Sequence, residues 1–239
     1  GIFLGVNKLT GAPVIFDPYL RANFNLAVIG VSGSGNSFAS KMMLTRLVEK
    51  RKDVAFYVVD PENEYGRIGA LLDAKVVEVK PGEELGLDPL TVFPKLDAAD
   101  MAAALAKVPV ELQSTLRTVI YRSSTLAEAY DGSPPELRRY LESLVHGPES
   151  FIFAGEPMSF TNRMVFSLRG LESEFLKQAI SLLLFGKIWA HLNDETVMPR
   201  QLEKLVLVDE AWLYMAVPPA AKFLERVSRM GRKRNILSR

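Results

Sequence analysis

Two kinds of apolar segment alternate along the chain, and together they predict an α/β fold. Short, nearly continuous apolar runs are typical of parallel strands that are buried on both faces. Such runs occur at residues 25–29, 54–60, 75–79, 151–153, 164–168 and 204–209. Longer segments with apolar residues at helical spacing lie at 38–52 and 172–191. Two further apolar runs, 1–6 and 13–17, flank a turn with a Thr-Gly pair and predict a leading hairpin.

The middle of the chain has a different pattern. Residues 97 to about 140 are rich in Ala, Leu, Glu and Arg and carry few strand signals, which indicates two or three helices. The Asp-Gly-Ser-Pro-Pro stretch at 131–135 breaks them. We therefore expect one domain over residues 1–239, with a helical insertion at 97–145.

A glycine-rich turn lies between the run at 25–29 and the helix predicted at 38–52, which is the setting of a phosphate-binding P-loop. Gly30 and Gly35 hold the outer glycine positions, and Ser37 holds the position of a hydroxyl that ligates Mg²⁺. Glycines let backbone N–H groups turn inward around a phosphate, and the helix N-terminus faces the same anion. The residues expected to bind the nucleotide here are Gly30, Ser32, Gly33, Ser34, Gly35, Asn36, Ser37 and Phe38.

A second phosphate-site pattern follows about 170 residues later, where the apolar run at 204–209 ends in Asp209 and Glu210. In P-loop enzymes the first acid supports the Mg²⁺ ion together with the loop hydroxyl of Ser37. A carboxylate directly after it can act as the general base toward water. An apolar strand that ends in two acids is common, but its pairing with the glycine-rich turn favours a nucleotide site.

Asn36 departs from the P-loop pattern, which has lysine at this position. That lysine places positive charge on the phosphates, whereas asparagine donates a hydrogen bond without charge, so turnover should fall about 10²-fold or more. Lys41 lies one helical turn further on, and we expect it to point away from the loop. The site is then either a natural binding-only site or a variant in which turnover is blocked. The retained magnesium and base positions favour the second explanation.

Composition and charge narrow the function class. The chain is 48% hydrophobic and 24% charged, which is typical of a soluble globular protein, and no apolar run approaches the length of a membrane span. The absence of cysteine excludes a disulfide framework and a thiolate zinc site, and the two histidines lack spaced partners. The net charge of +1 predicts no general affinity for nucleic acid, although residues 222–239 are locally basic.

Five segments in succession resemble the ATPase domain of the VirB-type ATPases of type IV secretion and conjugation, which are relatives of the HerA and FtsK motors. The Asp-Pro-Glu-x-Glu-Tyr segment at 60–65 is the most discriminating, because generic P-loop proteins lack it. The five segments are 30–37, 60–65, 87–90, 208–212 and 229–233.

The resemblance implies a RecA-like P-loop core with a mostly parallel central sheet and flanking helices. It also implies hydrolysis of ATP with Mg²⁺ and a hexamer at the cytoplasmic, inner face of the cell membrane. Other channel subunits and the coupling ATPase would be partners, while the isolated domain should be a monomer or weak oligomer. The family has a further strand, ending in a polar sensor residue, after its basic helix, whereas this chain stops at Arg239.

By position in the family pattern, Ser37 and Asp209 would hold Mg²⁺ and Glu210 would be the base. Glu62 and Glu64 would lie near the site. Within the predicted basic helix at 220–234, Arg229 and Arg232 are our candidates for an arginine finger that reaches the γ-phosphate of a neighbouring subunit.

Two other functions stay open at this point. A double-stranded DNA translocase of the HerA or FtsK type would have the same fold and should bind DNA in a strongly salt-dependent way. A non-hydrolysing nucleotide-binding scaffold would suit Asn36. A small-molecule kinase is the least favoured, because the sequence has no acceptor-site signature.

Overall fold

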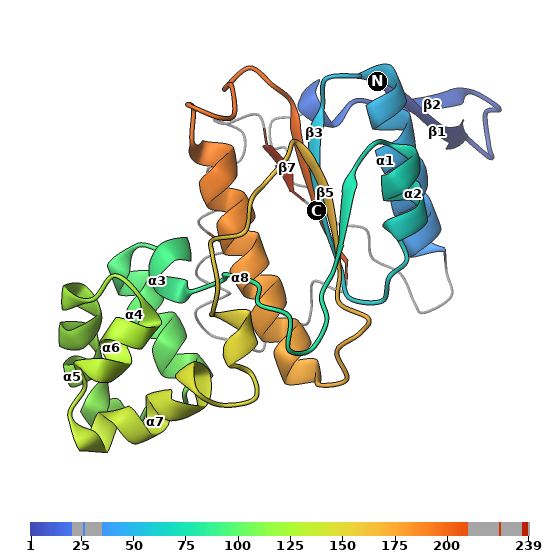
Figure 1. Ribbon diagram of the computed structural model, residues 1–239. Helices are drawn as coiled ribbons and strands as arrows, with labels where there is room; N and C mark the ends of the chain where they lie inside the picture. The colour runs from blue at the N-terminus through green and yellow to red at the C-terminus, as the bar shows by residue number, and fades with distance from the viewer. Residues whose placement is uncertain (21–25, 27–34, 210–224, 226–235, 239) are drawn as a thin grey trace.

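The structure is a computed structural model that describes residues 1–20, 26, 35–209, 225 and 236–238. Within these residues, five parallel strands form one sheet in the order β4–β5–β3–β6–β7 (Figure 1). The strands are β3 (Ala55–Asp60), β4 (Lys75–Glu78), β5 (Arg163–Ser167), β6 (Lys204–Val208) and β7 (Ile236–Ser238). All of them run the same way, so their carboxyl ends meet at one edge of the sheet.

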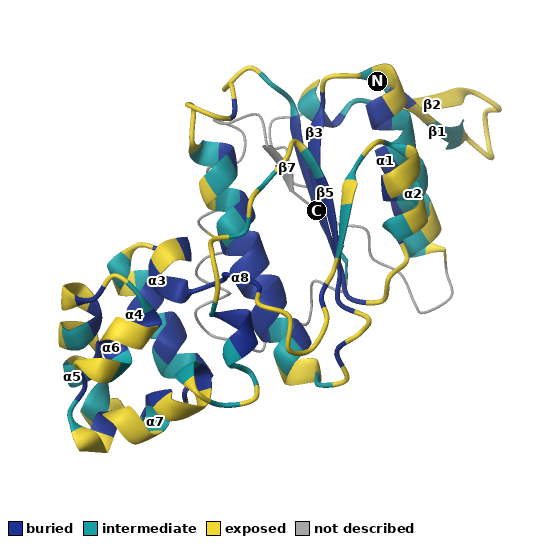
Figure 2. Ribbon diagram, viewed as in Figure 1, coloured by how far each residue is buried: buried dark blue, intermediate teal, exposed yellow. Residues whose placement is uncertain are grey.

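Helices cover both faces of this sheet (Figure 1). α1 (Asn36–Lys50) and α2 (Gly66–Leu71) lie on one face, and α8 (Glu174–Asn193) lies on the other. Along β3, Phe56 and Val58 join the hydrophobic cluster on the α1 side, while Tyr57 and Val59 join the cluster on the α8 side. Because β3 is buried on both faces, apolar and polar residues do not alternate along it (Figure 2).

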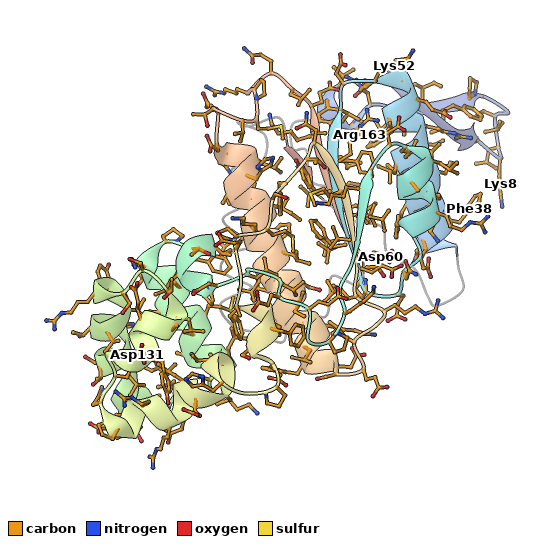
Figure 3. The ribbon with its side chains drawn as sticks, in the orientation of Figure 1. Lys8, Phe38, Lys52, Asp60, Asp131 and Arg163 are labelled. Carbon is orange, nitrogen blue, oxygen red and sulfur yellow. The ribbon has the colours of Figure 1, made fainter. Side chains whose placement is uncertain are left out.

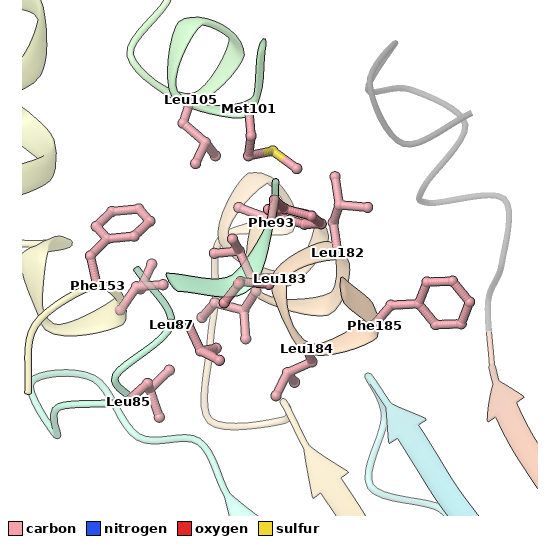
Figure 4. Packing of buried hydrophobic residues seen from close by; sticks show 14 of the residues in the cluster. Leu85, Leu87, Phe93, Met101, Leu105, Phe153, Leu182, Leu183, Leu184 and Phe185 are labelled. Carbon is pink, nitrogen blue, oxygen red and sulfur yellow. The ribbon is translucent and has the colours of Figure 1, made fainter. Parts of the chain in front are cut away.

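A group of helices packs beside α8, away from the sheet (Figure 1). They are α3 (Pro89–Val92), α4 (Lys95–Leu105), α5 (Val110–Arg122), α6 (Leu126–Asp131) and α7 (Pro135–Val145). Phe93 and Met101 lie in one continuous hydrophobic cluster with Leu182 and Leu183 of α8 (Figure 4). The long apolar helix α8 therefore joins the helical group to the sheet.

The chain begins with an antiparallel hairpin of β1 (Ile2–Val6) and β2 (Pro13–Phe16), followed by the short 3-10 helix η1 (Pro18–Leu20). Gly11 adopts a left-handed backbone (φ +70°) in the turn, where its N–H bonds the carbonyl of Asn7. The hairpin is largely exposed, as Figure 2 shows, whereas Ile2 is buried against the α1 side of the sheet.

Most of the elements expected from the sequence are confirmed. The hairpin, the strands expected at 54–60, 75–79, 164–168 and 204–209, and the helices at 38–52 and 172–191 all form, within a few residues. The stretch at 97–140 holds four helices rather than two or three, and the break at 131–135 lies between α6 and α7. The strand at 25–29 and the basic helix at 220–234 lie outside the described residues, apart from Leu26 and Glu225.

Two expectations are wrong. The apolar run at 151–153 is not a strand but belongs to the 3-10 helix η2 (Ser150–Ile152) and the residue after it. Its apolar side chains are buried among helices, so the run reflects burial rather than strand pairing. From the sequence we also expected the chain to stop without the strand that the family has after its basic helix. The structure does form a strand after the basic segment, since β7 pairs in parallel with β6.

The described part of the chain contains no helix that is long and apolar enough to cross a bilayer.

Candidate functional site

The beginning of α1 has the backbone expected at the end of a P-loop. Gly35 stands at the N-cap in the left-handed conformation (φ 89°, ψ 19°), and a Cβ built there would meet no atom within 4 Å. Glycine is therefore chosen here for its backbone freedom rather than for lack of room. Asn36 and Ser37 follow in the first turn, and both are half-buried. The preceding loop residues Gly30, Ser32, Gly33 and Ser34 lie outside the described residues.

Asp60 ends β3 at the carboxyl edge of the sheet and is fully buried (Figure 3). One carboxylate oxygen accepts the backbone N–H of Glu64 at 2.9 Å, and the other accepts that of Tyr65 at 2.8 Å. Burial raises the pKa of Asp60, and these two N–H groups partly oppose the increase. Asp60 thus folds the segment after β3 back on itself and fixes where Glu64 stands.

Glu64 joins this segment to α1. Its Oε2 lies 2.6 Å from Nζ of Lys41, and Ser37 lies close enough to influence the pKa of the same carboxylate. The hydrogen bond from Lys41, followed by that from Ser37, lowers the pKa of Glu64 against the effect of burial. Nζ of Lys41 also lies 5.3 Å from the ring centroid of Tyr65. The structure therefore pairs Lys41 of α1 with Glu64, and Ser37 lies near this pair.

Lys41 was not assigned to the site by the sequence analysis. We expected it to point away from the loop; residues 30–34 lie outside the described part, and within the described part Lys41 points to Glu64. The signal that could have found it is its spacing of four from Ser37, which puts both side chains on one face of α1.

Glu62 turns toward a different element. Its Oε1 lies 3.0 Å from Nζ of Lys177 in the first turn of α8, and Glu174 lies 3.6 Å from the same ammonium group. The hydrogen bond that Lys177 donates to Glu62 raises the pKa of Lys177, whose side chain is only 10% exposed. Glu62 and Glu64 therefore diverge, one toward α8 and the other toward α1.

Asp209 follows β6 at the same edge of the sheet. Its backbone N–H donates to the carbonyl of Val59 at 3.2 Å, which places it beside the residue that precedes Asp60. Asp209 is half-buried. The remaining predicted site residues, Glu210, Arg229 and Arg232, lie outside the described residues.

Phe38 stands apart from the other predicted site residues. Its side chain is 73% exposed at the start of α1 (Figure 3). It is also the first residue of the segment at 38–52 with apolar residues at helical spacing, and its exposure shows that it does not belong to the buried face of α1.

The oxygen donors at this edge suit a magnesium ion that is held jointly with phosphates. A serine hydroxyl and a carboxylate are hard ligands, and Mg²⁺ is usually bound by one or two such groups together with substrate phosphates and water. Among the described residues, no group of three or more His, Asp or Glu side chains gathers closely enough to hold a metal by itself. The residues present therefore fit a shared magnesium site rather than an all-protein one.

Two sequence comparisons bear on the family. The family model described as "Helicase HerA, central domain" matches residues 6–136, slightly more than half of the chain. This range includes the loop at 30–37, the segment at 60–65 and most of the helical group. Among curated proteins, no sequence matches at a significant level.

A comparison with solved structures bears on the fold. VirB4 of Thermoanaerobacter pseudethanolicus superposes with a TM-score of 0.82 at 21% sequence identity. The superposition covers 100% of this chain and 75% of the VirB4 chain. The α/β, RecA-like fold expected from the sequence is therefore confirmed by the likeness to VirB4, and the family model shows that the chain is related to HerA.

Proposed function

The chain belongs to the family of the HerA helicase central domain, and from that premise we propose that it is a motor domain that binds and hydrolyses ATP to energise type IV secretion or conjugative transfer. The observation that carries the proposal is the cluster at the carboxyl edge of the sheet. There Glu64 pairs with Lys41 of α1, and the backbone N–H of Asp209 donates to the carbonyl of Val59, in a fold like that of VirB4.

Each residue of the cluster has a role in this proposal. The N–H groups of the loop and of the first turn of α1 bind the phosphates of ATP, and Ser37 and Asp209 hold Mg²⁺. Magnesium, when bound, supplies positive charge against the negative charge that develops on the phosphoryl oxygens. Glu210 accepts the proton of the attacking water, and Arg229 or Arg232 reaches the γ-phosphate of a neighbouring subunit.

The assembly proposed around this domain is a homo-hexamer at the cytoplasmic side of a membrane-spanning channel, peripheral to the inner face of the membrane. Other channel subunits and the coupling ATPase would contact it. The support for this part is the likeness to VirB4, which spans the whole of this chain.

Asn36 should limit turnover rather than binding. The backbone N–H groups that bind the phosphates do not depend on the side chain at this position. Stabilisation of the negative charge on the transferring phosphoryl group does depend on it. We therefore expect the chain to bind Mg–ATP and to hydrolyse it poorly. Asn36→Lys should raise kcat by about 10²-fold or more, because it restores that charge.

The test measures Mg²⁺-dependent phosphate release and ATP binding for the chain and for Asn36→Lys, both at high protein concentration. Asn36→Lys combined with Asp209→Asn is the control, and it should lose the gained turnover. Efficient hydrolysis by the chain as it stands would contradict our assignment of the site. Binding without hydrolysis by both proteins would favour the non-hydrolysing scaffold.

A DNA translocase is the second candidate, because the matched family is described by a helicase. It differs from the secretion motor in requiring strong binding of double-stranded DNA that weakens steeply as salt rises. The net charge of +1 argues mildly against such binding.

A further inference from the structure

The leading hairpin projects beyond α1, at the opposite end of the molecule from the helical group (Figure 1). Its strands leave four large apolar side chains exposed: Phe3 (41%), Val6 (58%), Val14 (39%) and Ile15 (57%). At the tip, Leu9 is 96% exposed. Exposed apolar side chains that gather in one place, rather than singly, are typical of a surface that meets a partner or a membrane.

The tip of the hairpin, residues 7–12, satisfies its own backbone donors. Oδ1 of Asn7 accepts the N–H of Leu9 at 2.9 Å and that of Thr10 at 3.1 Å. The carbonyl of Asn7 accepts the N–H of Gly11 at 2.9 Å, and its own N–H donates to the carbonyl of Ala12 at 2.9 Å. The hydroxyl of Thr10 accepts the N–H of Ala12 at 3.3 Å. A backbone that is hydrogen-bonded internally can leave water at low cost, and entry into a bilayer interface requires this.

The charged side chains at the hairpin are basic. Residues 1–16 contain one charged side chain, that of Lys8, at the outer end of the hairpin (Figure 3). Arg46 and Lys50 of α1 both donate to backbone carbonyls within residues 1–3. The next acid, Asp17, is only 10% exposed and pairs with Arg51 at 2.7 Å. The apolar surface therefore has basic side chains at its edge, which complements a layer of anionic lipid headgroups.

The size of the hairpin favours a bilayer over another protein. β1 has five residues and β2 has four, so the paired strands are about 17 Å long and about 10 Å wide. A stable protein interface buries about 800 Å² on each partner, far more than such a face offers. Binding to a bilayer interface requires only a few apolar side chains together with attraction to anionic lipids.

We propose that the hairpin is a membrane-docking element: Leu9 enters the boundary between headgroups and acyl chains of a bilayer, and Lys8 pairs with anionic lipid phosphates. The inference rests on the part of the proposed function that locates the domain at the inner face of the membrane. It involves no nucleotide, so it can be tested separately from ATP hydrolysis.

The experiment measures co-sedimentation of the whole chain with vesicles, either of phosphatidylcholine alone or of phosphatidylcholine and phosphatidylglycerol in equal amounts. The chain should bind the anionic vesicles more strongly. Leu9→Ser should weaken binding to them about tenfold, because it removes the apolar side chain that enters the bilayer. Lys8→Gln should weaken the same binding about fivefold, while Lys8→Arg should preserve it, because it keeps the charge.

Val110→Ser is the matched control. Val110 is 80% exposed and begins α5 in the helical group, far from the hairpin (Figure 1). The same change from an apolar side chain to serine should leave vesicle binding unchanged there. Thermal unfolding of every variant verifies that each one is folded.

Three results would overturn the inference. The chain could bind neither kind of vesicle, or Leu9→Ser could bind as well as the parent chain. Sedimentation velocity without vesicles could instead show self-association that Leu9→Ser abolishes, which would assign the hairpin to a contact between copies. ATP binding measured on the same samples separates the two proposals: binding of vesicles without ATP would contradict the nucleotide site alone, and binding of ATP without vesicles would contradict the docking element alone.

Discussion

At the scale of single residues, two buried aspartates of this chain support backbone geometry. Asp60 organises the segment that carries Glu64, and Asp88 does the same for the helical group. Asp88 accepts the N–H of Leu90 at 2.8 Å and that of Leu126 at 2.6 Å, so it joins the starts of α3 and α6. Burial raises the pKa of Asp88, against the effect of these two donors.

Asp88→Ala should lower the free energy of unfolding by about 3 kcal/mol, because it leaves two backbone donors without their buried acceptor. Urea unfolding followed by circular dichroism measures the change. Asp100→Ala is the control: Asp100 pairs with Arg117 at 3.1 Å on an exposed surface and should cost less than about 1 kcal/mol. Equal losses in the two variants would show that Asp88 is no more than a surface charge.

At the scale of elements, α8 is the helix that packs against both the sheet and the helical group. It contacts the sheet on one side and the helical group on the other, so most of its residues are buried. Gly186 lies where α8 comes closest to the end of α3. A Cβ at this position would lie 2.4 Å from Cε1 of Phe93, the residue that follows α3. Glycine is needed at this position for close approach, and its backbone is an ordinary helical one.

Gly186→Val should destabilise the protein by about 2–3 kcal/mol through overpacking against Phe93, despite the better helix propensity of valine. Ala190→Val, one turn later and exposed, is the matched control and should cost less than about 0.7 kcal/mol. Thermal and urea unfolding measure the free energy of unfolding of the two variants. A Gly186 variant as stable as the control would mean that α3 shifts to make room.

At the scale of the whole molecule, we expect the isolated domain to be a monomer or a weak oligomer in dilute solution. The expectation follows from the resemblance, in which the hexamer forms within the full assembly together with partner subunits. Sedimentation velocity at micromolar concentration measures this. A stable hexamer would contradict the expectation.

The sequence by itself determined the succession of strands and helices and the positions of the chemistry. A strand such as β3, buried on both faces, must be apolar throughout, and a phosphate-binding turn needs glycine at positions such as Gly35. These are local requirements, so they can be read along the chain. They were sufficient for the α/β fold and for the family.

The tertiary structure decided what depends on side-chain direction and on pairing between distant segments. Residues 151–153 and Phe38 are apolar in the same way as core residues, but one segment forms a 3-10 turn and the other side chain faces solvent. Glu62 and Glu64 are two residues apart, yet one meets Lys177 and the other Lys41. Hydrophobic pattern fixes which face of an element is buried, but only the packed fold fixes which charged groups meet across that edge.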